Sequence, residues 1–144
     1  MTTIALDSTG LVACDSRETA GQTIVDDNCA KHSVVNGVHF WIAGRSGDAR
    51  LIVEAVTRGE RGEYSDGVSV AALVHDSGIF YTAGISKDEG FYLQIERAGN
   101  PVAIGSGSHH ALTAMDLGLS AKDAVKYAAK RDSQTGGKIR TWQF

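Results

Sequence analysis

The order in which strand-like and helix-like segments follow one another is the feature that most constrains the fold of this chain. β-Branched and apolar runs bounded by turn residues predict strands. These runs are residues 2–7, 11–15, 31–35, 38–44, 68–76, 78–85, 90–99 and 135–142. Apolar residues at helical spacing predict helices that begin near Asp48, Ser108 and Ser120. Strands and helices are therefore grouped rather than strictly alternating, which favours a largely antiparallel α+β layered fold.

Local signals fix several of these boundaries. The dipeptide Asn36-Gly37 is the strongest short-range signal for a hairpin. Asp48 stands at an N-cap position, and Ser120 with Asp123 reads as a capping box. Two polar or glycine-rich stretches predict irregular structure: residues 16–28 and 59–67.

The overall composition predicts one domain over residues 1–144 and excludes several classes of protein. Apolar residues make up 42% and charged residues 22% of the 144 residues, as in ordinary globular chains. A net charge of −3 gives no reason to expect nucleic acid or an anionic membrane as partner. There is no long apolar run and no secretory signal, so we expect a cytoplasmic protein. Cys14 and Cys29 are too few for a disulfide framework.

Three features could carry chemistry, and each also has an ordinary structural explanation. Thr2 either begins a strand or, once Met1 is removed, offers a hydroxyl beside its own α-amine. Asp15, in DSRETAG after the second strand, either shapes a polar loop or binds several donors. Lys31 is either an exposed edge residue or turns inward, where an ammonium needs a partner. Asp15 is the natural partner for an inward-facing Lys31, although spacing alone does not establish the pair.

The glycine-rich corners and the paired histidines are weaker signals. Residues 105–108 (GSGS) open a helix, which suits anion binding, but they lack both the Rossmann spacing and the Walker lysine. Adjacent His109 and His110 point in different directions on a helix, with no carboxylate or cysteine at helical spacing to complete a metal site. The sequence therefore predicts no metal and no cofactor.

Five features, taken in order along the chain, resemble the proteasome β-subunit family. They are TTI at residues 2–4, DSRETAG at 15–21, Lys31, AGRSGDA at 43–49 and RDSQTGG at 131–137. This family belongs to the N-terminal nucleophile hydrolases, and the resemblance is greatest to trimmed bacterial or phage proteasome-like proteases. It covers residues 2–56 and 102–137. It implies a four-layer αββα sandwich of two mainly antiparallel sheets, the N-terminal nucleophile hydrolase fold, reduced in size near residues 59–67 and 126–130.

The resemblance also implies a catalytic role for particular residues. Thr2, exposed by removal of Met1 with no propeptide to cleave, matches the nucleophile, and its α-amine matches the general base. Lys31 matches the lysine that assists the nucleophile, and Asp15 matches its acidic partner. Gly44 matches the backbone N–H donor to the oxyanion. Three further residues match the surroundings of the terminal amine: Ser106, Asp132 and Thr135, the last at a position where the family usually has serine.

The resemblance also implies which residues contact the substrate. Thr19 and Ser46 match positions that pair with the substrate backbone as an added strand. The first specificity pocket matches four residues: Glu18, Cys29, Ile42 and Ser46.

The implied function is a threonine-type endopeptidase that cleaves unfolded polypeptides or peptides inside a homo-oligomeric ring, with a possible ATPase unfoldase as partner. Two alternatives remain open. The same chemistry could serve an amidase that acts on a small amide, and the fold could serve a non-catalytic ring or scaffold subunit.

Overall fold

A computed structural model describes residues 2–59 and 63–144, which form two compact units. Unit 1 combines the two ends of the chain, Met1–Lys31 and Ala98–Phe144, and unit 2 is the central segment His32–Arg97. Two features considered above lie outside the described residues: Met1, with its expected removal, and residues 60–62 of the glycine-rich stretch.

Unit 1 is built on a four-stranded antiparallel sheet with the strand order β10-β1-β2-β11. Its strands are β1 (Thr3–Leu6), β2 (Leu11–Cys14), β10 (Val102–Gly105) and β11 (Arg140–Gln143). The N-terminal strand is thus central, although it comes first in the chain. Antiparallel pairing on both sides fixes the register of β1, with Thr3 opposite Gly105 and Ile4 opposite Cys14.

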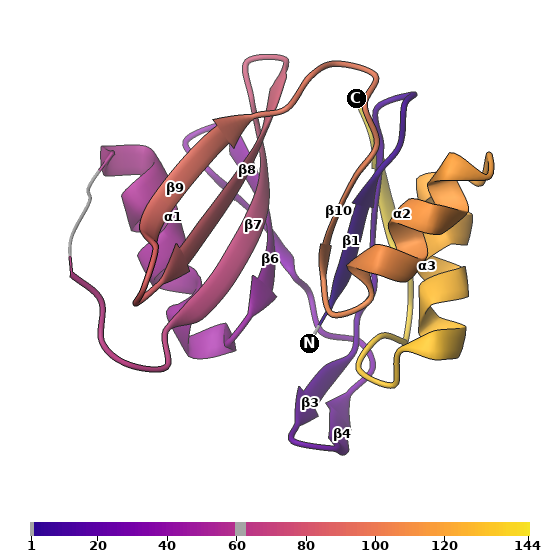
Figure 1. The fold of residues 1–144 in the computed structure, drawn as a ribbon, viewed down its shortest axis with the longest axis horizontal. Coiled ribbons are helices and arrows are strands. Elements are labelled where there is room, and N and C mark those ends of the chain that lie inside the picture. The colour runs from indigo at the N-terminus through magenta and orange to yellow at the C-terminus, as the bar shows by residue number, and fades with distance from the viewer. Residues whose placement is uncertain (1, 60–62) are drawn as a thin grey trace. The chain divides into compact units, whose positions relative to one another are not determined.

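Two antiparallel helices, α2 (Ser108–Asp116) and α3 (Ala121–Arg131), cover one face of this sheet (Figure 1). Small side chains fill the contact between helices and sheet, which allows the backbones to approach closely. The buried cluster consists of Ala5, Ala13, Ala111, Ala114, Met115, Ala121, Ala124, Val125 and Ala128. The predicted N-cap at Ser120 is confirmed, because its hydroxyl accepts the backbone N–H of Asp123 at 3.2 Å.

A short hairpin, β3 (Glu18–Ala20) with β4 (Thr23–Asp26), extends from unit 1 where the sequence predicted irregular structure (Figure 1). The prediction for residues 16–28 was wrong over these two strands. The β-branched run at residues 23–25 favours extended backbone, and Gly21 takes the left-handed φ of 59° that the turn requires. All of β4 is exposed, so no burial pattern marked it as a strand.

Unit 2 is a five-stranded antiparallel sheet in the order β5-β6-β7-β8-β9, and each strand pairs with the next in sequence. The strands are β5 (His32–Val35), β6 (Val38–Gly44), β7 (Ser69–Asp76), β8 (Ile79–Ser86) and β9 (Gly90–Ile95). The Asn36-Gly37 turn joins β5 to β6 with positive φ at both residues, which confirms the predicted hairpin.

A short 3₁₀ helix, η1 (Ser46–Asp48), leads into α1 (Ala49–Arg58), which packs on β6, β7 and β8. Ile52 and Ala55 of α1 are buried against Phe40 and Val74 of the sheet. The helix ends at Gly59, whose left-handed φ of 67° closes it.

Two boundary predictions are corrected. Asp48 precedes α1 as expected but does not cap it, because its carboxylate accepts the Ser69 N–H at 3.3 Å instead. The closing strand β11 begins at Arg140 and not at residue 135, because the residues between bind other parts of unit 1: the Gly136 N–H donates to Asp15 and the Gly136 carbonyl accepts the Ser16 N–H.

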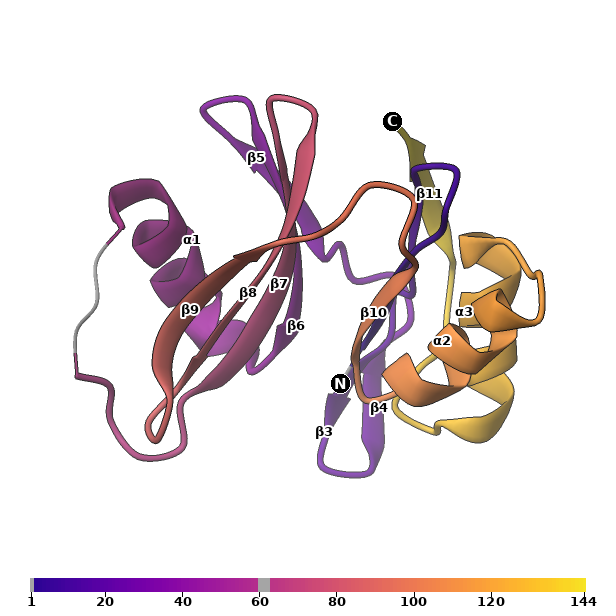
Figure 2. The ribbon, with the colours of Figure 1, turned by 45° about the horizontal axis from the view of Figure 1, so that its top comes forward.

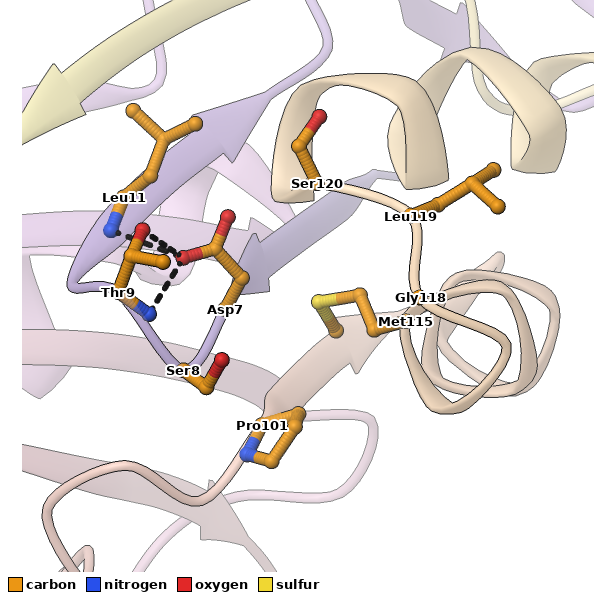
Figure 3. A pocket seen from close by; sticks show the side chains of 9 residues that line it. All are labelled: Asp7, Ser8, Thr9, Leu11, Pro101, Met115, Gly118, Leu119 and Ser120. Atoms are coloured by element: carbon orange, nitrogen blue, oxygen red, sulfur yellow. Dashed lines mark hydrogen bonds between the residues drawn. The ribbon is translucent and has the colours of Figure 1, made fainter.

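The sequence reading did not single out Asp7, a buried carboxylate that joins the β1–β2 turn to α3. Its Oδ1 accepts the N–H and hydroxyl of Thr9 and the N–H of Leu11, and its Oδ2 accepts the Ala121 N–H at 2.9 Å. Burial raises the pKa of Asp7, but these hydrogen bonds outweigh it and lower the pKa below its usual value. Asp7 also lines a pocket of about 290 Å³ with Pro101, Met115 and the α2–α3 turn (Figure 3).

We expect Asp7→Asn to lower the free energy of unfolding by about 1–3 kcal/mol at pH 7, because an amide cannot accept all of these hydrogen bonds. Since the folded pKa lies below the unfolded value of about 3.9, the contribution is present above that value and is lost as pH falls through the folded pKa. Urea unfolding at pH 7 and at low pH measures both effects. Asp116→Asn, at an exposed position, is the control. A difference that persists unchanged at low pH would contradict this explanation.

Candidate active site

Asp15 lies at the centre of the candidate site, and its side chain is fully buried. It follows β2, where the chain leaves the sheet. Its Oδ1 accepts the Thr3 N–H at 3.1 Å and the Lys31 ammonium at 2.9 Å. Its Oδ2 accepts the N–H of Gly136 at 2.9 Å and of Arg17 at 3.3 Å. The carboxylate therefore binds several donors, one of the two possibilities that the sequence left open.

Lys31 turns inward and pairs with Asp15, as the sequence suggested without establishing it. The side chain of Lys31 is only 8% exposed. Its Nζ also donates to the Arg17 carbonyl at 2.6 Å, so the ammonium is held by a charge and by a backbone acceptor. A buried cation held this way has a fixed position, unlike the long flexible side chain of a surface lysine.

Thr2 is joined directly to this ion pair through the backbone. The peptide N–H that Asp15 binds is the one between Thr2 and Thr3, and the same Oδ1 atom binds Lys31. Thr2 is buried, and its carbonyl lies so close to Gly105 that a Cβ there would stand 1.8 Å from the oxygen. Only glycine fits at this position of β10, and it holds the start of the chain close to the sheet.

A second set of hydroxyl and carboxylate groups continues from the buried Thr3 side chain. The hydroxyls of Thr3 and Thr135 lie 2.7 Å apart. Asp132 Oδ2 accepts the Thr135 hydroxyl at 2.7 Å and the Ser106 hydroxyl at 2.6 Å. Burial raises the pKa of Asp132, but the hydrogen bonds from Ser106, Thr135 and the Gln134 backbone outweigh it and lower the pKa. The structure thus brings together the three residues expected to surround the terminal amine.

Arg17 anchors the loop that carries Asp132 and Thr135. Its guanidinium binds both carboxylate oxygens of Asp27, at 2.8 and 3.1 Å, and donates to the Ser133 carbonyl at 3.1 Å. The guanidinium also lies against Gly136, where a Cβ would stand 2.5 Å from it. Any side chain at Gly136 would therefore push away the arginine that positions the loop.

Two expected substrate-pocket residues of unit 1, Glu18 and Cys29, are neighbours. Burial, followed by the negative charge of Glu18, raises the pKa of the Cys29 thiol. Thr19, expected to pair with the substrate backbone, donates its hydroxyl to Gln134 at 2.6 Å. Glu18, Thr19 and Cys29 therefore lie in or next to the β3–β4 hairpin, which the sequence did not predict.

The other expected residues, Ile42, Gly44 and Ser46, belong to unit 2. Gly44 ends β6 with a left-handed φ of 115°, and a Cβ there would stand 2.5 Å from the Ser69 carbonyl oxygen. Both observations require glycine at this position. Ile42 is half-buried on β6, and Ser46 is exposed at the first position of η1.

Sequence reading missed several groups that support the site: Thr3, Ser16, Arg17 and Arg140. Arg140 Nη1 donates to the Ser16 hydroxyl at 2.6 Å and to the Cys29 carbonyl at 3.1 Å, which ties β11 to the segment before Lys31. The doubled threonine at the start did not single out Thr3, because neighbouring strand residues face opposite ways and the pattern alone does not place both in one site. Arg140 had no local signal, since its partners lie more than a hundred residues away.

Among the described residues, no group of three or more histidine, cysteine, aspartate or glutamate side chains could hold a metal ion. Over residues 2–59 and 63–144, no helix has the length and apolar character needed to cross a membrane.

The fold is proteasome-like, and the comparison with solved structures shows this over nearly the whole chain. Thiobacillus denitrificans BPH, a β-proteasome homologue, in complex with epoxomicin matches with a TM-score of 0.68 and 16% sequence identity. The match covers 99% of this chain and 97% of that one. A second structure of Thiobacillus denitrificans BPH matches with a TM-score of 0.67 and 17% identity, over 99% of this chain and 96% of that one. No protein-family model matches the sequence, and neither does any curated protein.

We expect Lys31→Met to lower the free energy of unfolding by about 3 kcal/mol, because it leaves the buried Asp15 carboxylate without its cation. The double variant Asp15→Asn/Lys31→Met should lose less than the sum of the two single variants, with a coupling of about 1 kcal/mol or more. Denaturant unfolding of the four proteins measures the coupling. Lys122→Met, at an exposed position of α3, is the control. Additive effects would show that the ion pair contributes no specific interaction.

Proposed function

We propose that this chain is a threonine-type endopeptidase of the proteasome β-subunit family. The observation that carries the proposal is the Asp15 carboxylate, which binds both the Lys31 ammonium and the peptide N–H of Thr2–Thr3 through one oxygen atom. Support also comes from the proteasome-like fold, shared with a protein whose structure contains epoxomicin, a proteasome inhibitor. The complete set of residues that match the family's catalytic positions favours an active enzyme over a scaffold subunit.

The reaction begins once Met1 has been removed. The Thr2 hydroxyl oxygen attacks the carbonyl carbon of the scissile peptide bond, and its proton passes through a water molecule to the Thr2 α-amine. The tetrahedral intermediate then collapses, the carbon–nitrogen bond breaks, and the amine returns the proton to the leaving amino group. Water hydrolyses the resulting ester and regenerates Thr2. An α-amine has a pKa of about 7.7–8.0, close enough to neutrality for it to serve as the base.

The neighbouring residues each assist this reaction. The Lys31 charge, fixed by Asp15, stabilises the threonine oxygen as it loses its proton. Ser106, Asp132 and Thr135 orient the terminal amine and its water through their linked hydrogen bonds. By the resemblance to the family, the Gly44 N–H donates to the oxyanion, a type of interaction worth about 10²–10³ in rate.

The substrate is an unfolded polypeptide or peptide bound as an added strand, with Thr19 and Ser46 as its backbone partners. Glu18, Cys29, Ile42 and Ser46 line the first specificity pocket.

The same resemblance supports further features of the enzyme. Residues 1–144 form one N-terminal nucleophile hydrolase domain, a reduced four-layer αββα sandwich. The domain acts in a cytoplasmic homo-oligomeric ring, with an ATPase unfoldase as a possible partner. Enclosure in a ring keeps folded proteins away from the active sites.

We expect Thr2→Ala to abolish cleavage of unstructured fluorogenic peptides, because no hydroxyl remains to attack. Thr2→Ser should keep measurable activity, since it retains both the hydroxyl and the α-amine. Steady-state kinetics measures both variants, and intact mass spectrometry verifies that Met1 has been removed from each. Thr113→Ala, at an exposed position of α2, is the matched control. Undiminished cleavage by Thr2→Ala would refute the assignment, and hydrolysis of small amides without any peptide cleavage would favour the amidase instead.

A further inference from the structure

A pocket in unit 1 contains a carboxylate that the proposed catalysis does not use. The pocket has a volume of about 290 Å³, and every residue that lines it belongs to unit 1. The β1–β2 turn, the α2–α3 turn and Pro101 form its walls (Figure 3). The carboxylate, Asp7, comes four residues after Thr3, a distance of about 13 Å along a strand. Figure 2 shows the β1–β2 turn at the end of the unit 1 sheet away from the β3–β4 hairpin, so the pocket is separate from the candidate active site.

The carboxylate lies at the inner end of the pocket. Asp7 and Met115 are buried, with exposed fractions of 8% and 6%. Ser8, Leu119 and Ser120 are exposed and surround the opening. A ligand that enters the pocket therefore meets Asp7 where little water remains. Charges attract each other more strongly in such a place than at the open surface.

Asp7 can accept a further hydrogen bond. An ionised carboxylate offers about four acceptor positions, two on each oxygen. Oδ1 already accepts two hydrogen bonds from Thr9 and one from Leu11. Within the described part of the chain, Oδ2 accepts only the Ala121 N–H. Figure 3 shows Oδ2 turned away from the β1–β2 turn, toward Ser120, where it can accept a donor that a ligand supplies.

The charge of Asp7 is not balanced by a cation of the chain. Over residues 2–59 and 63–144, no lysine, arginine or histidine forms an ion pair with it. The buried Asp15, by contrast, binds the Lys31 ammonium. Neutral donors alone hold Asp7, and their hydrogen bonds lower its pKa, so the group is ionised at neutral pH. A buried carboxylate of this kind favours a ligand that brings a positive charge.

The rest of the lining indicates which kind of cation fits. A calcium ion takes about six to eight oxygen ligands, and the described residues contain no group of three or more acidic, histidine or cysteine side chains that could hold a metal. The pocket is instead largely apolar. Its apolar side chains are Leu11, Pro101, Met115 and Leu119. Its volume is near the lower end of the range for small-molecule sites, about 300–1,000 Å³. These features together suit a small organic cation.

We propose that this pocket binds a small organic amine in its protonated form, with the ammonium group donating to Asp7 Oδ2 and the hydrocarbon part packed against Met115 and Leu119. The carboxylate repels an anion of the same shape. A neutral alcohol can donate to Oδ2 but lacks the charge, and a hydrogen bond between ionised groups is roughly twice as strong as a neutral one. The site does not involve Thr2, so it goes beyond the proposed protease function and does not depend on it.

Three probes of similar shape test the charge of the ligand: 2-phenylethylamine, 2-phenylethanol and 3-phenylpropionate. Isothermal titration calorimetry of the full chain at pH 7 measures their binding. We expect the amine to bind about tenfold more tightly than the alcohol, and the carboxylate to show no binding. Equal affinity for the amine and the alcohol would overturn the proposal, as would an amine that does not bind.

A matched pair of variants tests the location of the site without changing Asp7, whose loss also destabilises the fold. Leu119 lines the pocket and is 38% exposed, whereas Leu117 is 79% exposed and is not among the lining residues. We expect Leu119→Lys to weaken binding of 2-phenylethylamine at least about tenfold, because the new ammonium repels the ligand and competes for Asp7. Leu117→Lys adds the same charge two residues away and should keep the wild-type affinity.

Unchanged affinity in Leu119→Lys would overturn the proposal, and so would an equal loss in both variants. Thermal unfolding of each variant verifies that it is folded.

Discussion

The Asp15 carboxylate is the group on which the rest of unit 1 depends. Removing a carboxylate from water is costly unless its oxygen atoms are bound, and here donors from separate segments bind both of them. Thr3 donates from the N-terminal strand, Lys31 from the segment that leads out of unit 1, and Gly136 from the loop before β11. These segments are far apart in sequence. One buried charge therefore fixes where the chain begins, where the lysine lies and where the last loop closes.

This arrangement explains why a structural interaction and a proposed catalytic one can share the same atoms. Asp15 binds the N–H of the Thr2–Thr3 peptide, and Gly105, which admits no side chain, lies against the carbonyl of the same peptide. The Thr3 hydroxyl extends the anchoring into the Thr135 and Asp132 network. With the second residue held so closely, the proposed hydroxyl and amine need no conformational search, and positioning of this kind supplies much of an enzyme's rate.

Local sequence signals predicted the elements well where a single segment determines its own structure. The Asn36-Gly37 hairpin, the Ser120 cap and the grouping of strands and helices all follow from local backbone preferences. The β3–β4 hairpin was missed because its strands are exposed and carry no burial pattern. Asp48 looked like a cap, but a distant backbone N–H on β7 competes for its carboxylate.

The residues of the candidate site also divide into those that the sequence predicted and those that it did not. Asp15 and Lys31 could be proposed as a pair because burying a lysine requires an acid, and the family resemblance gave the register. Asp7, Thr3 and Arg140 could not be found, since each acts through partners that are distant in sequence. The resemblance matched Gly44 to a backbone donor, whereas Gly105 was visible only as a glycine. For both, the φ angle and the close neighbours show why no other residue fits.

The proposed mechanism is tested most directly by whether the hydroxyl and the α-amine of Thr2 react together. A peptide epoxyketone such as epoxomicin needs both groups, so intact mass spectrometry of the Met1-free chain after treatment reports on them in one measurement. A single adduct is expected, which maps to Thr2 and disappears both in Thr2→Ala and after acetylation of the α-amine. An unmodified Met1-free chain, or an adduct that survives acetylation, would contradict it.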